Sequence, residues 1–184
     1  MNYKIHTTSD VQTEHIGDNT TIWQYCVILK GAAIGSNCNI CSHCFIVNSV
    51  SIGNNVTVKS GVQLWNGVII ADEVFIGPNV SFTNDLAPRS KNTNWHELTT
   101  TVGKGASIGA NATILCGIEL GAYCMIGAGS VVTKSVPPFT LWYGNPAQHK
   151  GFITEQGRVL GLDLKDKETD KQYILVQGKP ICHD

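Results

Sequence analysis

The sequence predicts an all-β fold, a parallel β-helix with a triangular cross-section. Aliphatic residues recur at every sixth position from residue 16 to residue 132, with one interruption. The next position is often glycine, which tolerates the positive φ of a corner, and the fourth position is small or β-branched. A pattern in which two of every six residues point inward is typical of a short strand followed by a turn. Three such hexapeptides make one triangular coil, and stacked coils bury one continuous core.

The aliphatic positions form two runs on either side of an irregular segment, residues 84–101. A period of six fits neither a helix nor a simple alternating strand. The first run comprises Ile16, Ile22, Ile28, Ile34, Ile40, Ile46, Ile52, Val58, Leu64, Ile70, Ile76 and Phe82, and the second comprises Val102, Ile108, Ile114, Leu120, Ile126 and Val132. The irregular segment is polar and aromatic, so we expect a long functional loop there.

Composition narrows the class of protein. The chain has 184 residues, 15% of them charged, and a net charge of −1, which gives no reason to expect a nucleic-acid or membrane-surface partner. The first ten residues lack the apolar run of a signal peptide, and no apolar segment has the length of a membrane span. We therefore expect a cytoplasmic protein with one main domain.

The seven cysteines are expected to be free thiols rather than metal ligands or disulfides. Four of them fall in the small inward position of the repeat, where a thiol behaves as a compact apolar group. These are Cys26, Cys38, Cys44 and Cys124, whereas Cys41 and Cys116 fall at corners and Cys182 in the tail. No metal site is predicted.

Three asparagines, Asn48, Asn66 and Asn84, are each separated by three hexapeptides, one full coil, and should stack at one corner. They could form a ladder of amides that bond to each other along the stack. Alternatively, Asn66 and Asn84 could bind a polar ligand, because Asn84 opens the loop and Asn66 follows Trp65, which we expect to be exposed. The indole of Trp65 would suit a ligand with a planar base.

Ala110 and Ala128 are also one full coil apart and should lie at a different corner with few side chains. Bare backbone there could offer N–H and C=O groups to an extended chain with amides, such as pantetheine. Small residues could equally be present because they suit tight corners.

The repeat resembles that of the hexapeptide-repeat acyltransferases over residues 10 to 147. This resemblance implies a left-handed β-helix, acetyl-CoA as acyl donor lying along the coils, and a homotrimer with sites between chains. The closing segment Gly-Asn-Pro-Ala, residues 144–147, is similar to that of coenzyme A-dependent members and implies that Lys134, Asn145 and Pro146 lie near the adenosine 3′-phosphate. Gln148 stands where these enzymes usually have arginine.

A narrower resemblance rests on Phe-Thr-Asn-Asp at residues 82–85, followed by Pro88 and Arg89. It is similar to N-acetyltransferases of nucleotide-linked amino sugars, in particular dTDP-3-amino-3,6-dideoxyhexoses used for cell-surface glycans. Enzymes for UDP-linked 3-amino sugars look similar and remain an alternative. The resemblance implies that Asn84 and Asp85 orient the sugar amine. Arg89 is a candidate diphosphate ligand or a solvated loop arginine.

His96 is the only histidine in the loop and is the candidate general base. The 3-amino-sugar subgroup implies a reaction without a protein base, because an amine is already a good nucleophile. A sugar or serine O-acetyltransferase would need a base to activate a hydroxyl.

Two other classes share this kind of fold. The zinc carbonic anhydrases need a close histidine pair, and no two histidines here are closer than nine positions. A non-catalytic assembly subunit would not need the polar loop or the closing segment. We therefore expect an enzyme without a metal.

Residues 148–184 are predicted to form a small cap over the end of a β-helix domain that spans residues 1–147. Two short strands, residues 152–154 and 158–160, flank a turn and should form a hairpin. Residues 173–176 read as another strand.

Overall fold

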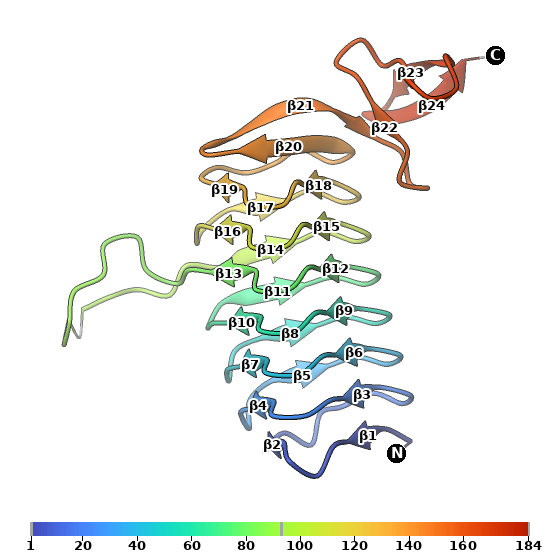
Figure 1. The fold of residues 1–184 in the computed structure, drawn as a ribbon. Coiled ribbons are helices and arrows are strands. Elements are labelled where there is room, and N and C mark those ends of the chain that lie inside the picture. The colour runs from blue at the N-terminus through green and yellow to red at the C-terminus, as the bar shows by residue number, and fades with distance from the viewer. Residues whose placement is uncertain (1, 93, 184) are drawn as a thin grey trace.

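The computed structural model describes residues 2–92 and 94–183 of the chain. It confirms the predicted fold class. Stacked triangular coils form a left-handed parallel β-helix from which one long loop protrudes (Figure 1). The described residues contain no α-helix, and therefore none with the length and apolar character needed to cross a membrane.

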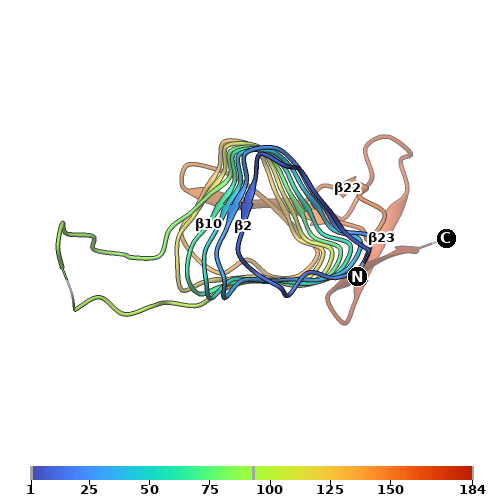
Figure 2. The same cartoon turned by 90° about the horizontal axis from the view of Figure 1, so that it is seen from below.

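The coils build three faces, which we call faces A, B and C (Figure 2). Face A contains β1 (Lys4–Ile5), β3 (Thr21–Ile22), β6 (Asn39–Ile40), β9 (Thr57–Val58), β12 (Phe75–Ile76), β15 (Ser107–Ile108), β18 (Met125–Ile126), β20 (Thr140–Gly144), β21 (Ala147–Ile153) and β22 (Val159–Leu160). Face B contains β2 (Asp10–Val11), β4 (Val27–Ile28), β7 (Phe45–Ile46), β10 (Gln63–Leu64), β13 (Ser81–Phe82), β16 (Thr113–Ile114) and β19 (Val131–Val132). Face C contains β5 (Ala33–Ile34), β8 (Ser51–Ile52), β11 (Val68–Ile70), β14 (Thr100–Val102) and β17 (Glu119–Leu120).

The chain runs from face A to face B to face C and then rises to the next coil. We name the corners AB, BC and CA after the faces that they join. Strands of successive coils pair in parallel with partners three hexapeptides apart, for example Asn39 with Thr57. Across the loop the partners are 32 apart, as in Phe75 with Ser107, so one coil carries 14 extra residues. Because β14 begins at Thr100, the irregular segment ends two residues earlier than predicted.

The aliphatic residues at the repeat positions from Ile16 to Val132 point inward and are buried, as the repeat predicts. Ile22, Ile40, Val58, Ile76 and Ile108 form one such column behind face A, and each is at most 1% exposed. Burying an aliphatic side chain of this size stabilises a fold by about 1.5–3 kcal/mol. The stacked columns therefore hold the coils together through one continuous core.

The cysteines are free thiols, and the four in the inward positions are buried as predicted. Burial raises the pKa of the Cys124 thiol to about 12. Cys116 was expected at an open corner, but it is only 3% exposed. Its N–H donates to Thr83 Oγ1 at 2.9 Å, so the base of the loop covers this corner.

The upper end of the prism is closed by the β20–β21 hairpin, whose Trp142 and Ala147 join the core. The expected boundary at residues 147/148 falls inside β21. The predicted hairpin is present, since Ile153 pairs with Val159. The last hairpin, β23 (Gln172–Val176) with β24 (Lys179–His183), lies outside the triangular outline rather than over the end of the prism (Figure 2).

Candidate functional site at two corners of the prism

At corner CA, polar side chains of one coil accept hydrogen bonds from the backbone N–H groups of the coil below. The N–H of Ser36 donates to Asn54 Oδ1 at 2.9 Å, and the N–H of Asn54 donates to Asp72 Oδ1 at 2.7 Å. A pair of stacked amides is also found at this corner, where Asn19 Nδ2 donates to Asn37 Oδ1 at 3.3 Å. The amide ladder had been predicted at the corner of Asn48, Asn66 and Asn84 instead. From Ser36 to Asp72, a side chain of one coil thus satisfies a backbone N–H of the coil below, and this part of corner CA is structural.

Corner AB lacks such side chains in the upper coils. Ala110 and Ala128 occupy the position that Ser36, Asn54 and Asp72 hold at corner CA, two residues after the inward aliphatic residue. Among the described residues, the N–H groups of Ala110 and Ala128 donate no hydrogen bond. Two backbone donors therefore remain free for a ligand at this corner.

An apolar groove lies beside these donors, with a volume of about 280 Å³. Its lining is formed by Phe75, Ser107, Gly109, Met125, Gly127 and Ala128, all on face A or at corner AB. Glycine is required at Gly77 because successive coils lie close together there: a Cβ on Gly77 would come 2.7 Å from Ala110 N. A narrow apolar groove with free N–H groups along one edge suits an extended ligand that carries carbonyl groups.

The turn of the β20–β21 hairpin stands above this groove and contains Asn145 and Pro146, joined by a cis peptide bond. Both residues are exposed, and the preceding Tyr143 lies directly against Gly127. The two residues predicted from the closing segment are therefore at the same corner as Ala110 and Ala128.

Lys134 is at a different corner from the other predicted cofactor residues. It follows β19 and belongs to corner BC, in the column that contains Asn84 and Cys116. Its Nζ lies 5.3 Å from the centroid of the buried Trp142 ring. The corner of Lys134 could have been predicted from the spacing along the chain, because Lys134 falls in the column of Asn84 once the 14 inserted residues are subtracted.

At corner BC, the chain leaves face B after Phe82 and enters the loop through Asn84 and Asp85, which are both half-buried. Asp85 Oδ1 accepts a hydrogen bond from the N–H of Ala87 at 2.8 Å, and this turn fixes the direction of the departing chain. The Asn84 and Asn66 amides hydrogen-bond to no other described residue, and Asn48 Oδ1 accepts from Gly31 N at 3.1 Å. The three amides thus form no ladder among themselves.

The returning end of the loop is anchored on corner BC by contacts that the sequence did not reveal. Ser49 Oγ donates to Glu97 Oε2 at 3.1 Å and accepts from Gly67 N at 3.0 Å. Gly67 has a φ of +84°, and a Cβ there would come 2.9 Å from Leu98 O. Gly67 is therefore the residue that lets the loop return to the prism.

Trp65 is half-buried rather than exposed, because its ring packs edge-on against Phe45 at 5.5 Å between centroids. Phe45 lies one coil below, which explains why the spacing of six did not predict the contact. The indole still borders Asn66 at corner BC.

Arg89 and His96 both belong to the inserted loop and are exposed. Arg89 Nη1 donates to the carbonyl of Pro88 at 2.8 Å. Among the described residues, His96 forms no hydrogen bond with Asn84 or Asp85. Within these residues, no three His, Cys, Asp or Glu side chains gather as a metal site.

Corners AB and BC, whose polar groups include some without a hydrogen-bond partner among the described residues, lie at the same height along the prism but at opposite edges of face B. Gly77 at corner AB and Asn84 at corner BC belong to the same coil. Ala110 and Cys116, which mark these corners one coil higher, stand at the two ends of the hexapeptide that contains β16, so the full width of face B separates them. Reacting atoms must approach to about 3–3.5 Å. One protomer therefore does not bring its two corners together.

Comparison with known proteins agrees with this architecture. The family model for bacterial transferase hexapeptide proteins (six repeats) matches residues 15–48, 49–84 and 99–134, more than half of the chain. The chain belongs to the bacterial transferase hexapeptide family. The matched ranges stop at the loop and resume after it, so the loop is an insertion in the hexapeptide repeat.

Relatives of this hexapeptide protein include several acyltransferases. The dTDP-3-amino-3,6-dideoxy-α-D-galactopyranose 3-N-acetyltransferase of Aneurinibacillus thermoaerophilus is 56% identical over 80 residues, which are 44% of this chain and 38% of that protein. A hexapeptide-repeat-containing acetyltransferase from Vibrio cholerae, solved with acetyl coenzyme A, is 30% identical, with a TM-score of 0.52 over 58% of this chain and 62% of that one. A UDP-N-acetylglucosamine acyltransferase from Bacteroides fragilis shares the fold at 22% identity, with a TM-score of 0.68 over 82% of this chain and 61% of that one.

Proposed function

We propose that this hexapeptide protein is an acetyl-CoA-dependent N-acetyltransferase that acts on a nucleotide-linked amino sugar. The acceptor is the 3-amino group of a dTDP-3-amino-3,6-dideoxyhexose, destined for a cell-surface glycan. The observation that carries the proposal is the groove at corner AB with its two free backbone donors. The 56% identity to an enzyme named for this acceptor supports the choice of sugar, over the part of the chain that it matches.

Acetyl-CoA would lie along face A with its pantetheine arm in the groove. The free N–H groups of Ala110 and Ala128 would donate to the two amide carbonyls of that arm. The apolar walls formed by Phe75 and Met125 would cover its methylene groups. The V. cholerae relative, solved with acetyl coenzyme A, supports this donor.

The amino sugar would be held at corner BC by Asn84 and Asp85. Asp85 Oδ1 shapes its own turn, which leaves Oδ2 to accept a hydrogen bond from the sugar amine. The neutral amine nitrogen attacks the thioester carbonyl carbon and forms a tetrahedral oxyanion. The carbon–sulfur bond then breaks, the amide product forms, and the nitrogen's proton passes to the departing coenzyme A thiolate, directly or through Asp85.

The separation of the two corners supports a homotrimer as the working unit. A three-fold axis parallel to the prism would keep every coil at its own level. Corner BC of one protomer would then meet corner AB of the next, with Asn84 beside Gly77 and Ala110. The protruding loop, with exposed Leu86 and Trp95, would lie against the neighbouring protomer.

The proposal is tested by incubating the protein with acetyl-CoA and a panel of acceptors: dTDP- and UDP-linked 3-amino sugars, a nucleotide sugar without an amine, and serine. Free thiol is measured with a thiol reagent and the product by mass spectrometry. We expect turnover with dTDP-3-amino-3,6-dideoxyhexose. Turnover of only the UDP-linked sugars would show that the acceptor is carried by UDP and not by dTDP. Turnover of serine would show that the protein is an O-acetyltransferase.

The shared site has a separate test. Asp85→Ala removes the acceptor half of the site and Ala128→Trp fills the donor half, so each variant alone should lose most of its activity, at least about tenfold. Mixed trimers of the two should regain activity at up to about a quarter of their sites, because some interfaces combine two intact halves. No recovery in mixed trimers would place both halves in one protomer.

A further inference from the structure

The groove at corner AB ends at a defined coil, where the residues of the corner change from glycine to larger side chains. The position directly after the inward aliphatic residue forms one column along this corner. From the upper end of the prism the column reads Gly127, Gly109, Gly77, Lys59, Cys41 and Trp23. The three glycines leave the backbone bare along the groove, and Lys59 is the first side chain below them.

The outward-facing residues of face A change at the same level. From the upper end they read Met125, Ser107, Phe75, Thr57, Asn39 and Thr21. The first three line the groove, and Phe75 is the lowest residue of its lining. Thr57 and Asn39, in the next two coils down, present polar side chains instead. An apolar ligand therefore finds no continuation of the groove below Phe75.

Lys59 reaches upward across this boundary and covers the lower end of the groove. Its Nζ lies 5.9 Å from the centroid of the Phe75 ring, which belongs to the next coil above. A cation at this distance from an aromatic ring is attracted to the ring face. Trp23 behaves in the same way two coils lower, since its Nε1 donates to Asn39 Oδ1 of the next coil at 2.7 Å. Large side chains in this column thus lie over face A, and the glycines above Lys59 keep the groove open.

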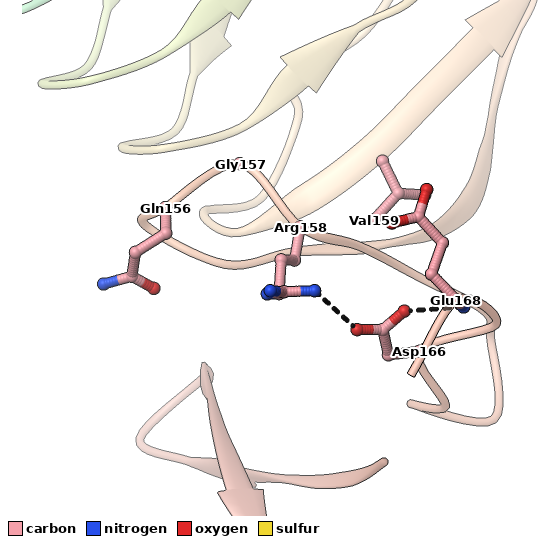
Figure 3. Close-up of a pocket in the computed structure, with 6 residues that line it drawn as sticks. All are labelled: Gln156, Gly157, Arg158, Val159, Asp166 and Glu168. Carbon is pink, nitrogen blue, oxygen red and sulfur yellow. Dashed lines mark hydrogen bonds and ion pairs between the residues drawn. The ribbon is translucent and has the colours of Figure 1, made fainter. Parts of the chain in front are cut away.

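The hollow in the cap offers no second place for an apolar chain. It has a volume of about 390 Å³ and is lined by Gln156, Gly157, Arg158, Val159, Asp166 and Glu168 (Figure 3). Arg158 Nη1 lies 3.2 Å from Asp166 Oδ2, and an apolar chain placed here would desolvate this ion pair. The hollow also adjoins β22, the last strand of face A at the upper end, several coils from Phe75.

We propose that Lys59 closes the lower end of the groove and thereby restricts the acyl group of the donor to acetyl. The inference rests on the proposed function and adds the residue that sets the length of the acyl chain. With the nucleotide end of acetyl-CoA beside the β20–β21 hairpin, its thioester would reach the coil of Gly77 and Asn84, and the acyl methyl group would face Lys59. A longer chain would have to displace the Lys59 side chain or leave the groove. Either outcome moves the thioester carbon away from the amine, which must approach it to about 3–3.5 Å.

The experiment compares acetyl-, butanoyl- and octanoyl-coenzyme A as donors. Calorimetry measures their binding without any sugar, and the ratio of their kcat/KM values is measured with the acceptor amine. In the wild-type protein, kcat/KM should fall at least about a hundredfold from acetyl to butanoyl because the thioester is displaced, and binding should not tighten with chain length. Lys59→Gly continues the glycine column by one coil and opens about 4.8 Å of groove. Butanoyl-coenzyme A should then bind about tenfold tighter than to the wild-type protein, since each buried methylene contributes about fourfold.

Two variants of Cys41, the next residue of the column, sharpen the test. Cys41→Gly alone should leave the chain-length preference unchanged, because Lys59 still closes the groove above it. Combined with Lys59→Gly, it should add a second coil of groove and admit octanoyl-coenzyme A. Glycine already occupies this position in three coils, and the backbone N–H groups of Lys59 and Cys41 keep their hydrogen bonds to the coil above. The variants should therefore fold, as circular dichroism would verify.

Failure of the proposed function and failure of this inference give different results. If the wild-type protein binds no acetyl-CoA, the proposed function fails. If it binds acetyl-CoA but uses octanoyl-coenzyme A equally well, or if Lys59→Gly keeps the wild-type preference, Lys59 does not set the chain length. If Cys41→Gly alone relaxes the preference, the groove ends below Lys59 and the assignment is also wrong.

Discussion

Corner CA differs from corners AB and BC although all three arise from the same six-residue repeat. At corner CA, side chains of one coil hydrogen-bond the backbone of the coil below, as Asp72 does for Asn54. At corner AB the equivalent N–H groups of Ala110 and Ala128 are free, and at corner BC the amides of Asn66 and Asn84 are free among the described residues. Polar groups that the fold does not satisfy are available to a ligand, and the groove beside Ala128 adds the space that a ligand needs.

The largest effect is expected from closing corner AB. Ala128→Trp should fill the groove and abolish measurable coenzyme A binding, a loss of at least about a hundredfold because a bulky ring occupies the path of the ligand. Calorimetry checks this. Gln24→Trp makes the same change at the same corner position several coils below the groove, and it should leave binding unchanged.

Corner BC should respond in turnover rather than in donor binding. Asn84→Ala and Asp85→Ala should each lower kcat about tenfold to a thousandfold, because they remove groups that orient the amine. Asp85→Asn keeps an oxygen for the N–H of Ala87 and removes the charge. If Asp85→Asn and Asp85→Ala lose the same factor in kcat, the charge of the carboxylate is needed for turnover. If Asp85→Asn keeps the wild-type kcat, Asp85 contributes only through its hydrogen bond to the N–H of Ala87.

Corner AB can be given the character of corner CA by one substitution. Ala128→Asn places a carboxamide one coil above Ala110, as Asn54 stands one coil above Ser36. It should satisfy the N–H of Ala110 and weaken coenzyme A binding about tenfold while leaving stability unchanged or slightly raised. Undiminished affinity would mean that this N–H takes no part in binding.

The converse change at corner CA should affect stability and not function. Asp72→Ala removes the acceptor of two hydrogen bonds from Asn54, at 2.7 Å and 3.3 Å, and should lower the free energy of unfolding by about 1 kcal/mol. Urea denaturation measures this. A substantial fall in kcat would contradict the division between structural and functional corners.

The smallest effect is expected for His96, which lies exposed in the loop away from both corners. His96→Ala should change kcat less than about threefold if no protein base is needed. Loss of turnover in a folded variant would replace the base-free reaction with general base catalysis by His96.

The repeat was enough to predict the coils, the buried columns and four of the buried cysteines, because each depends on spacing along the chain. It could not predict the contact of Trp65 with Phe45, which depends on side chains from different coils. The burial of Cys116 also depends on Thr83, which comes much earlier in the chain, before the insertion. Lys134 was grouped with Asn145 and Pro146 through the resemblance of the closing segment, and subtracting the 14 inserted residues places it at corner BC of the same protomer.

The site residues of corner AB were predicted as a choice between ligand binding and tight packing. The sequence left this choice open because a small residue fits both. The apolar groove beside Ala128 is the observation that supports ligand binding, because unused N–H groups also occur at other corner positions such as Ser42 and Ser60.

The 14 extra residues enter at a corner and leave the pairing of the strands above and below in register. A chain without them would keep the same three-hexapeptide coil and the same core. The residues that build the core and the residues of the inserted loop are therefore separate parts of the sequence. The loop can change in length and composition without any change in the coils that carry it.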